Sequence, residues 1–172
     1  MITDYEQAIE KYGFYIATPI GTSMMPLLRE RIDTVKLVAP NDLKKHDVVL
    51  YMRNDKTLVL HRIIKVKNDL FTMCGDNQFM LEKNIKRSQI IAVMEGFYRE
   101  EEYIPTTDKE YQKYVKKIIR KRPFKHFKYL IKSIIKKINQ KVKELPEVLS
   151  LDEFKGNSGG QKYNSIIVDP KG

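Results

Sequence analysis

The stretch Thr57-Leu-Val-Leu-His-Arg-Ile-Ile-Lys-Val66 decides the fold that we expect for this chain. It is dense in branched aliphatic side chains, which favour a β-strand over a helix. Comparable segments flank it at short spacing, separated by turn-forming residues. The expected strands are Asp33–Val38, Asp47–Arg53, Thr57–Val66, Leu70–Cys74 and Ile90–Tyr98. Because no helical pattern separates these strands, the sequence predicts a mainly β domain with an antiparallel, barrel-like sheet.

His61 lies inside this strand, where a side chain is held in a fixed position, as a general base requires. Ser23 lies in Gly21-Thr-Ser-Met-Met-Pro26 and Asp76 lies in Cys74-Gly-Asp-Asn77. A serine hydroxyl becomes a nucleophile when a histidine accepts its proton and an acid orients that histidine. A histidine in an apolar strand is also commonly a hydrogen-bonded core residue. The catalytic interpretation therefore depends on the three side chains meeting in the fold.

Four short motifs together resemble those of the type I signal peptidase family: Gly21-Thr-Ser-Met-Met-Pro26, Asp47-Val-Val49, His61-Arg62 and Gly75-Asp-Asn77. The chain is most similar to the endoplasmic-reticulum-type branch, in which histidine replaces the lysine base of typical bacterial enzymes. The resemblance covers residues 21–95, which is under half of the chain. It implies the coiled β-fold that this family shares with the LexA-like self-cleaving repressors.

The resemblance implies a serine endopeptidase that cleaves a signal or leader peptide, or a small preprotein, at or near a membrane. Ser23 would be the nucleophile and His61 the general base. Asp76 would be the acid that orients His61, with Glu82 as the alternative. No cofactor is needed for this chemistry.

The same resemblance assigns the groups around the nucleophile. The backbone N–H of Ser23, together with Thr22, would hold the oxyanion, because Gly21 stands where many family members have a serine. The expected substrate-binding residues are Met24, Met25 and Pro26. The two methionines are also compatible with a place in the hydrophobic core.

Composition limits the other function classes. The 172 residues fit one domain with extensions, and the single cysteine, Cys74, cannot form an internal disulfide. Three histidines and one cysteine show no metal-ligand spacing, so no metal site is expected. No apolar run reaches the roughly 18 residues of a membrane span, and no secretory signal or N-terminal anchor is recognisable. The expected location is the cytoplasm or the periphery of a membrane.

The net charge of +10 is concentrated in one segment. Between Lys109 and Leu145 there are 14 Lys or Arg residues and two Glu, so this segment carries +12 and the rest of the chain −2. The pattern predicts helices over 108–122 and 123–145, with Pro123 in the first turn of the second. Apolar residues form a stripe along the second helix at spacings of three and four: Phe124, Phe127, Leu130, Ile131, Ile134, Ile135, Ile138, Val142 and Leu145.

Three interpretations of this basic amphipathic extension stay open. It could lie on an anionic membrane surface, bind nucleic acid through phosphates, or pack its stripe on the domain or a partner helix. The membrane surface is favoured, because phosphate binding does not need an apolar stripe.

The sequence thus predicts a signal-peptidase-like catalytic domain over residues 1–107, the basic helical extension over 108–145 and a flexible tail over 146–172. A short amphipathic helix, Thr3–Tyr12, begins the first domain and is expected to cover the sheet. Two alternatives compete with the peptidase: a LexA-like self-cleaving regulator that binds nucleic acid, for which Lys65 is a candidate base, and a non-catalytic membrane adaptor.

Overall fold

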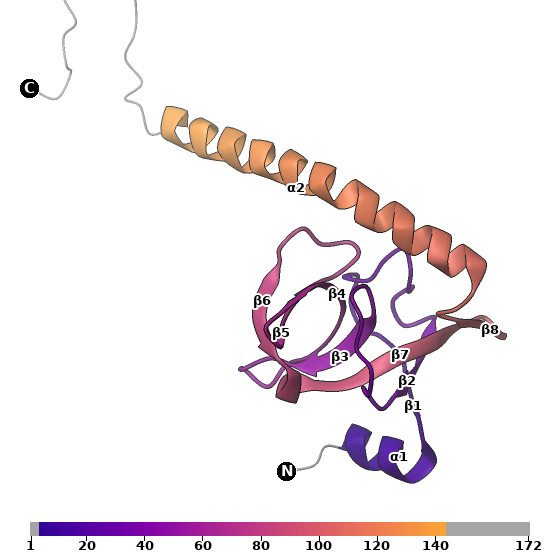
Figure 1. Cartoon of the computed structure of the whole chain (residues 1–172). Coiled ribbons are helices and arrows are strands. Elements are labelled where there is room, and N and C mark those ends of the chain that lie inside the picture. The colour runs from indigo at the N-terminus through magenta and orange to yellow at the C-terminus, as the bar shows by residue number, and fades with distance from the viewer. Residues whose placement is uncertain (1–3, 144–172) are drawn as a thin grey trace, which may run out of the picture. The chain divides into compact units, whose positions relative to one another are not determined.

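The computed structural model describes residues 4–143 (Figure 1). Three predicted features lie outside the described residues: the start of the first helix at Thr3, the end of the apolar stripe at Leu145 and the tail 146–172. The elements in chain order are α1 (Asp4–Tyr12), β1 (Tyr15–Ala17), β2 (Thr34–Val38), β3 (Val48–Met52), β4 (Leu58–Lys67), β5 (Leu70–Cys74), β6 (Glu82–Lys86), the 3-10 turn η1 (Arg87–Gln89), β7 (Ile90–Arg99), β8 (Glu102–Pro105) and α2 (Lys109–Lys143).

One antiparallel sheet forms the body of the fold. Its strands follow the order β1-β2-β7-β3-β4-β5-β6, and β8 pairs with β7 (Figure 1). The mainly β, antiparallel architecture predicted from the sequence is confirmed. The sheet does not close into a barrel: among the described residues the pairing runs from β1 to β6 without joining these two edges. Closure depends on the stagger between the first and last strands, which the pattern of each single strand does not reveal.

The five predicted strands are confirmed to within one or two residues at their ends. Three further strands, β1, β6 and β8, are not among the five predicted ones. The sequence of β6 is Glu-Lys-Asn-Ile-Lys, and only Ile85 is buried. Such a polar segment becomes a strand because it pairs with β5, where Phe71 lies opposite Ile85 and Met73 opposite Glu82. Cross-strand pairing here outweighs a weak intrinsic preference.

Two clusters of buried side chains hold the fold together. One is enclosed by β3, β4, β5, β6 and β7 and includes Tyr51, Ile63 and Met73. The other lies between β2, β3 and β7 and the segment that follows Ser23, whose Met24 and Leu28 are buried. Helix α2 contributes Tyr111 and Val115 to this second cluster.

Helix α2 is continuous from Lys109 to Lys143, so the two helices expected on either side of Pro123 form one. Pro123 cannot donate to the carbonyl of Ile119, but good helix formers on both sides continue the helix through this single missing bond. The chain divides into two compact units within α2: the unit with the sheet extends to Tyr129, and the other begins at Leu130. Among residues 4–143, no helix is long and apolar enough to cross a membrane.

Candidate active site

Ser23 lies in the turn-rich segment between β1 and β2. Gly21 adopts a φ of +100°, a left-handed conformation that favours glycine, and its N–H donates to Glu30 Oε1 at 2.9 Å. The N–H of Met25 donates to the Thr22 carbonyl at 3.2 Å, which tightens the turn around the serine. These bonds hold Ser23, which is half-buried, at the wall of a cavity of about 500 Å³.

The Gly75-Asp-Asn77 segment packs directly against the Ser23 turn. The N–H of Asn77 donates to the Ser23 carbonyl at 2.8 Å, and Asn77 Nδ2 donates to the Thr22 carbonyl at 3.3 Å. A Cβ on Gly75 would lie 2.5 Å from the Ser23 carbonyl oxygen. Only glycine permits this approach without a backbone shift, so two motifs about fifty residues apart in sequence form one rigid unit.

His61 lies in β4 opposite Val49 of β3, and its side chain is 1% exposed. Its Nδ1 is 3.2 Å from the Tyr51 hydroxyl and 3.3 Å from Glu82 Oε1. His61 and Ser23 both line the 500 Å³ cavity. Tyr51 and Glu82 both contact Nδ1, so Nε2 is the ring nitrogen that does not take part in these two contacts.

Glu82 is held in place by Arg53 at the end of β3. Arg53 Nε donates to Glu82 Oε2 at 2.7 Å, and Arg53 Nη2 donates to Oε1. Burial raises the pKa of Glu82, but hydrogen bonds from Arg53 and Tyr51 outweigh burial and lower the pKa overall. Glu82 is therefore ionised at neutral pH and can stabilise a positive charge on the imidazole.

His61 is neutral at neutral pH. Its pKa is lowered to about 4, mainly because the charged imidazolium loses hydration inside the protein, and the nearby Arg53 acts in the same direction. Glu82, and to a smaller extent Asp76, act in the opposite direction. A neutral imidazole has a free lone pair and can accept a proton, as a general base must.

Asp76, the expected orienting acid, has a different main partner. Its buried carboxylate accepts hydrogen bonds from Arg62 Nε at 2.8 Å and Arg62 Nη2 at 2.6 Å, and from the Tyr114 hydroxyl at 3.1 Å. Arg62 in turn donates to the carbonyl of His46 and to the hydroxyl of Tyr111. Two buried charges are thus paired with several further hydrogen bonds, the arrangement that lets an ion pair persist in a protein interior.

The expected substrate-binding residues do not share one location. Met24 is buried and lines the cavity beside Ser23. Met25 is 36% exposed, and Pro26 lines a second cavity of about 420 Å³ together with Phe97 and Tyr111. Thr22, expected near the oxyanion, lines the first cavity.

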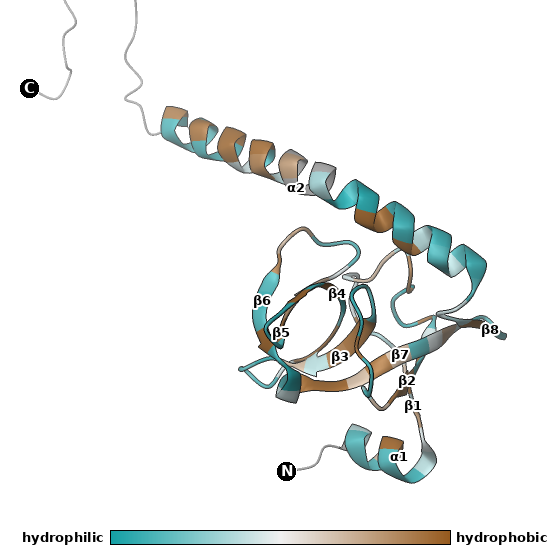
Figure 2. Cartoon of the chain, viewed as in Figure 1, coloured by the Kyte–Doolittle hydropathy of each residue, from teal (hydrophilic) through white to brown (hydrophobic). Residues whose placement is uncertain are grey.

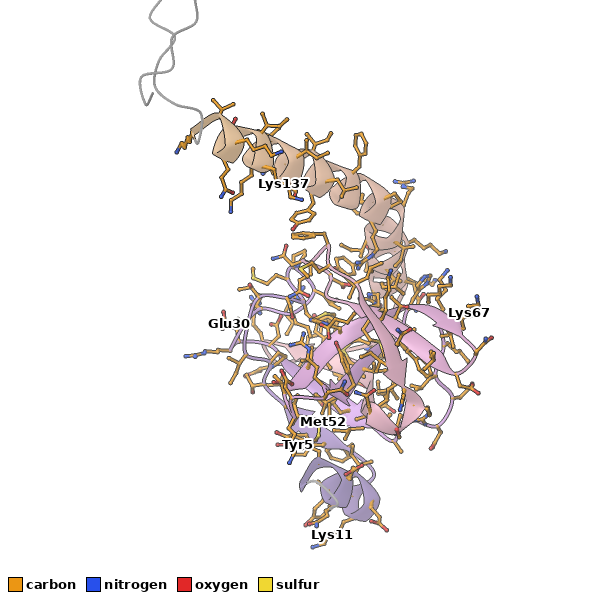
Figure 3. The ribbon with its side chains drawn as sticks, turned by 90° about the vertical axis from the view of Figure 1, so that its left-hand side faces the viewer. Tyr5, Lys11, Glu30, Met52, Lys67 and Lys137 are labelled. Carbon is orange, nitrogen blue, oxygen red and sulfur yellow. The ribbon has the colours of Figure 1, made fainter. Side chains whose placement is uncertain are left out.

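Part of the cavity wall could not be predicted from the sequence. It is made by Tyr5 of α1, which Figure 3 labels, and by apolar side chains of β1 to β4: Ala17, Val35, Leu37, Leu50, Leu58, Val59 and Leu60. The alternation of Val35 and Leu37 with Lys36 was a usable signal in the sequence. In the structure Val35 and Leu37 are buried, while their neighbours in β2 are half-buried. The sequence also did not indicate Tyr51 and Arg53. They meet at the Glu82 carboxylate, so their place in the site depends on the position of β6. Lys65, the alternative base, is exposed.

The first part of α2 contacts the segment that follows β5. Besides the bond from Tyr114 to Asp76, Arg122 Nη2 donates to the Gly75 carbonyl at 3.4 Å. The ring of Tyr129 stacks on Phe79 with centroids 3.5 Å apart. All of these contacts lie within the unit that ends at Tyr129. This part of α2 therefore supports the segment that carries Asn77 and leads to Glu82.

Among the described residues, no group of three or more His, Cys, Asp or Glu side chains is arranged to hold a metal ion. No protein-family model, curated protein or solved structure matches the chain.

Proposed function

We propose that this chain is a serine endopeptidase in which Ser23 is the nucleophile, His61 the general base and Glu82 the acid that orients His61. One observation carries the proposal: Ser23 and His61 line the same cavity, while Nδ1 of His61 is held by Glu82 and Tyr51. The resemblance of the sequence motifs to the type I signal peptidase family supports the same chemistry.

In the proposed mechanism, His61 Nε2 accepts the proton of the Ser23 hydroxyl as Ser23 Oγ attacks the scissile carbonyl. The imidazolium that forms is stabilised by the Glu82 carboxylate. Backbone N–H groups at Ser23 and Thr22 stabilise the negative oxygen of the tetrahedral intermediate. His61 then protonates the leaving amine, and a water molecule activated by the same imidazole releases the acyl group.

The proposed substrate is a signal or leader peptide, or a small preprotein, with an apolar side chain next to the cleaved bond. The cavity beside Ser23 is lined by Leu50, Leu58 and Leu60, which offer no charged partner to a substrate side chain. Arg53 and Gln78 supply polar groups at its wall. A pocket that combines apolar side chains with a few placed polar groups is the usual form of a site that selects by side-chain shape.

Variants at the two central residues test the proposal. Ser23→Ala and His61→Ala are expected to abolish cleavage of a diverse peptide mixture, measured by mass spectrometry, while circular dichroism stays unchanged. Ser88→Ala is the matched control, because Ser88 is exposed on η1 and should keep full activity. An acylating serine probe should label the wild type and not Ser23→Ala. Cleavage that survives in either Ala variant would refute the assignment.

The same experiments separate the alternatives. A non-catalytic adaptor predicts no labelling of Ser23 and no cleavage by any variant. A self-cleaving regulator predicts truncation of the chain itself, at a rate independent of protein concentration. Lys65 is exposed and is not among the residues that line the cavity beside Ser23, so its position does not favour it as the base for that reaction.

A further inference from the structure

The distal part of α2, from Leu130 to Lys143, exposes an unpartnered apolar face. Six aliphatic side chains of this segment are between 42% and 59% exposed: Leu130, Ile131, Ile134, Ile135, Ile138 and Val142. Figure 2 shows hydrophobic residues recurring along one side of these turns. A contiguous stripe of this kind is rare on a protein surface unless something binds it.

The charge of the same segment is entirely positive. Lys132, Lys136, Lys137, Lys141 and Lys143 carry it, and no Asp or Glu occurs anywhere between Tyr111 and Lys143. Lys132, Lys136 and Lys143 fall on the side of the helix opposite the apolar stripe, given about 3.6 residues per turn. Figure 3 shows Lys137 on this part of the helix.

From these two features we infer that the segment Leu130–Lys143 binds the surface of an anionic lipid bilayer, lying in the plane of the interface. The aliphatic face would enter the boundary between headgroups and acyl chains, and the lysines would contact anionic headgroups. The lysines recur every one to four residues, so this helix fits the surface of a bilayer and not its interior. This inference does not depend on the proposed peptidase activity.

Charge and shape together favour a bilayer over the other occupants. A second copy packed stripe to stripe would bring Lys137 and Lys141, which fall beside the stripe at about 3.6 residues per turn, close to the lysines of the other copy with no acidic partner. Like charges at a helix interface destabilise it. Nucleic acid would satisfy the lysines but leave the six aliphatic side chains in water. A bilayer surface satisfies both faces at once.

Flotation of the full chain with lipid vesicles tests this inference. We expect the protein to float with vesicles of phosphatidylcholine and phosphatidylglycerol, to bind vesicles of phosphatidylcholine alone much more weakly, and to lose binding as salt is added. The double variant Ile134→Gln/Ile138→Gln should reduce partitioning at least about tenfold, because two aliphatic side chains no longer enter the interface. Glutamine keeps helix propensity, so the helical signal should not change.

Two further variants separate charge from apolar contact. Lys132→Gln/Lys136→Gln should weaken binding to anionic vesicles and flatten its salt dependence, without changing binding to neutral vesicles. Gln140→Ala, on the polar side, should behave as wild type. The inference is overturned if the chain does not float with anionic vesicles or if the isoleucine variant floats as well as wild type. Two other results would also overturn it. One is a wild-type dimer that does not form in the isoleucine variant, and the other is binding to duplex DNA that is stronger than binding to anionic vesicles and is unchanged in that variant.

Discussion

Nδ1 of His61 lies 3.3 Å from Oε1 of Glu82, and Arg53 donates hydrogen bonds to both oxygens of the same carboxylate. His61 is contributed by β4 and Glu82 by β6, two strands that are each paired with β5. The imidazole is therefore fixed by the sheet and not by a mobile loop. A base held in this way needs little reorganisation when it accepts a proton.

Replacing Glu82 by Gln should lower kcat by about 10²–10⁴-fold. The imidazolium formed during the reaction loses its negative partner, and the neutral imidazole is no longer held in the tautomer with its proton on Nδ1. The substitution keeps the shape of the side chain, so KM for a peptide substrate should change little. Steady-state kinetics on one cleaved peptide checks this. An activity that falls only with the folded fraction would assign Glu82 a purely structural role.

Asp76→Asn should affect stability more than chemistry. The substitution leaves Arg62, whose side chain is fully buried, without its charged partner, which typically costs about 3–5 kcal/mol of unfolding free energy. Urea denaturation measures this loss. Under conditions where the variant is still folded, its kcat should exceed that of Glu82→Gln. The reverse order would mean that Asp76 orients the base.

The strands could be predicted from the sequence, and Ser23 could be proposed as a nucleophile, because these signals are local. β4 is recognisable from its run of branched side chains, and Ser23 from the glycine and proline around it. The partner of His61 could not be predicted in the same way. Glu82 reaches the imidazole because Met73 of β5 pairs with it, and that register is a property of the assembled sheet.

The buried ion pair could not be predicted from the sequence for a related reason. Asp76 and Arg62 belong to two of the motifs that carry the peptidase resemblance, which implied a catalytic function for Asp76. The fold pairs their side chains with each other and with Tyr111 and Tyr114 of α2. Nothing in the pattern of α2 indicated that its first turns enter the core of the sheet.

The low pKa of His61 predicts activity that extends into acid. Protonated His61 cannot act as a base, so kcat/KM should rise with pH through the pKa of His61 in the free enzyme. The half-maximal point is expected near pH 4, where burial places that pKa, and not near 6.5. A pH–rate profile on a soluble peptide checks this, over the range in which circular dichroism shows the folded chain.

The unfolding free energy should also depend on pH through the protonation of His61. Between about pH 6.5 and about pH 4 the unfolded chain binds a proton at His61 and the folded chain does not, so unfolding free energy falls as the pH falls. The lowered pKa of Glu82 adds to this loss in more acidic solution. His61→Gln should flatten the slope across this window. An unchanged slope in the variant would contradict a lowered pKa at His61.

Gly75→Ala should displace Ser23 without changing the side chain of Ser23. The new Cβ would lie 2.5 Å from the Ser23 carbonyl oxygen, so one of the two backbone segments must move. We expect a loss of about 1–3 kcal/mol in unfolding free energy, together with a fall in kcat. Gly13→Ala is the control: Gly13 has a φ of +80° but open space around it, so it should lose stability and keep its activity.

Two truncations should divide α2 into parts with different functions. A chain that ends at Tyr129 keeps Tyr111 and Val115 in the core, the bond from Tyr114 to Asp76 and the stack of Tyr129 on Phe79. It should stay folded and cleave a soluble peptide as the full chain does, while losing its binding to anionic vesicles.

A chain that ends at Asp108 loses about 1.5–3 kcal/mol for each of the two buried core side chains, and Arg62 loses its hydrogen bond to Tyr111. Urea denaturation should therefore place its midpoint well below that of the longer chain. Equal midpoints would show that the first turns of α2 do not contribute to the core, and vesicle binding by the chain that ends at Tyr129 would assign the lipid contact to another surface.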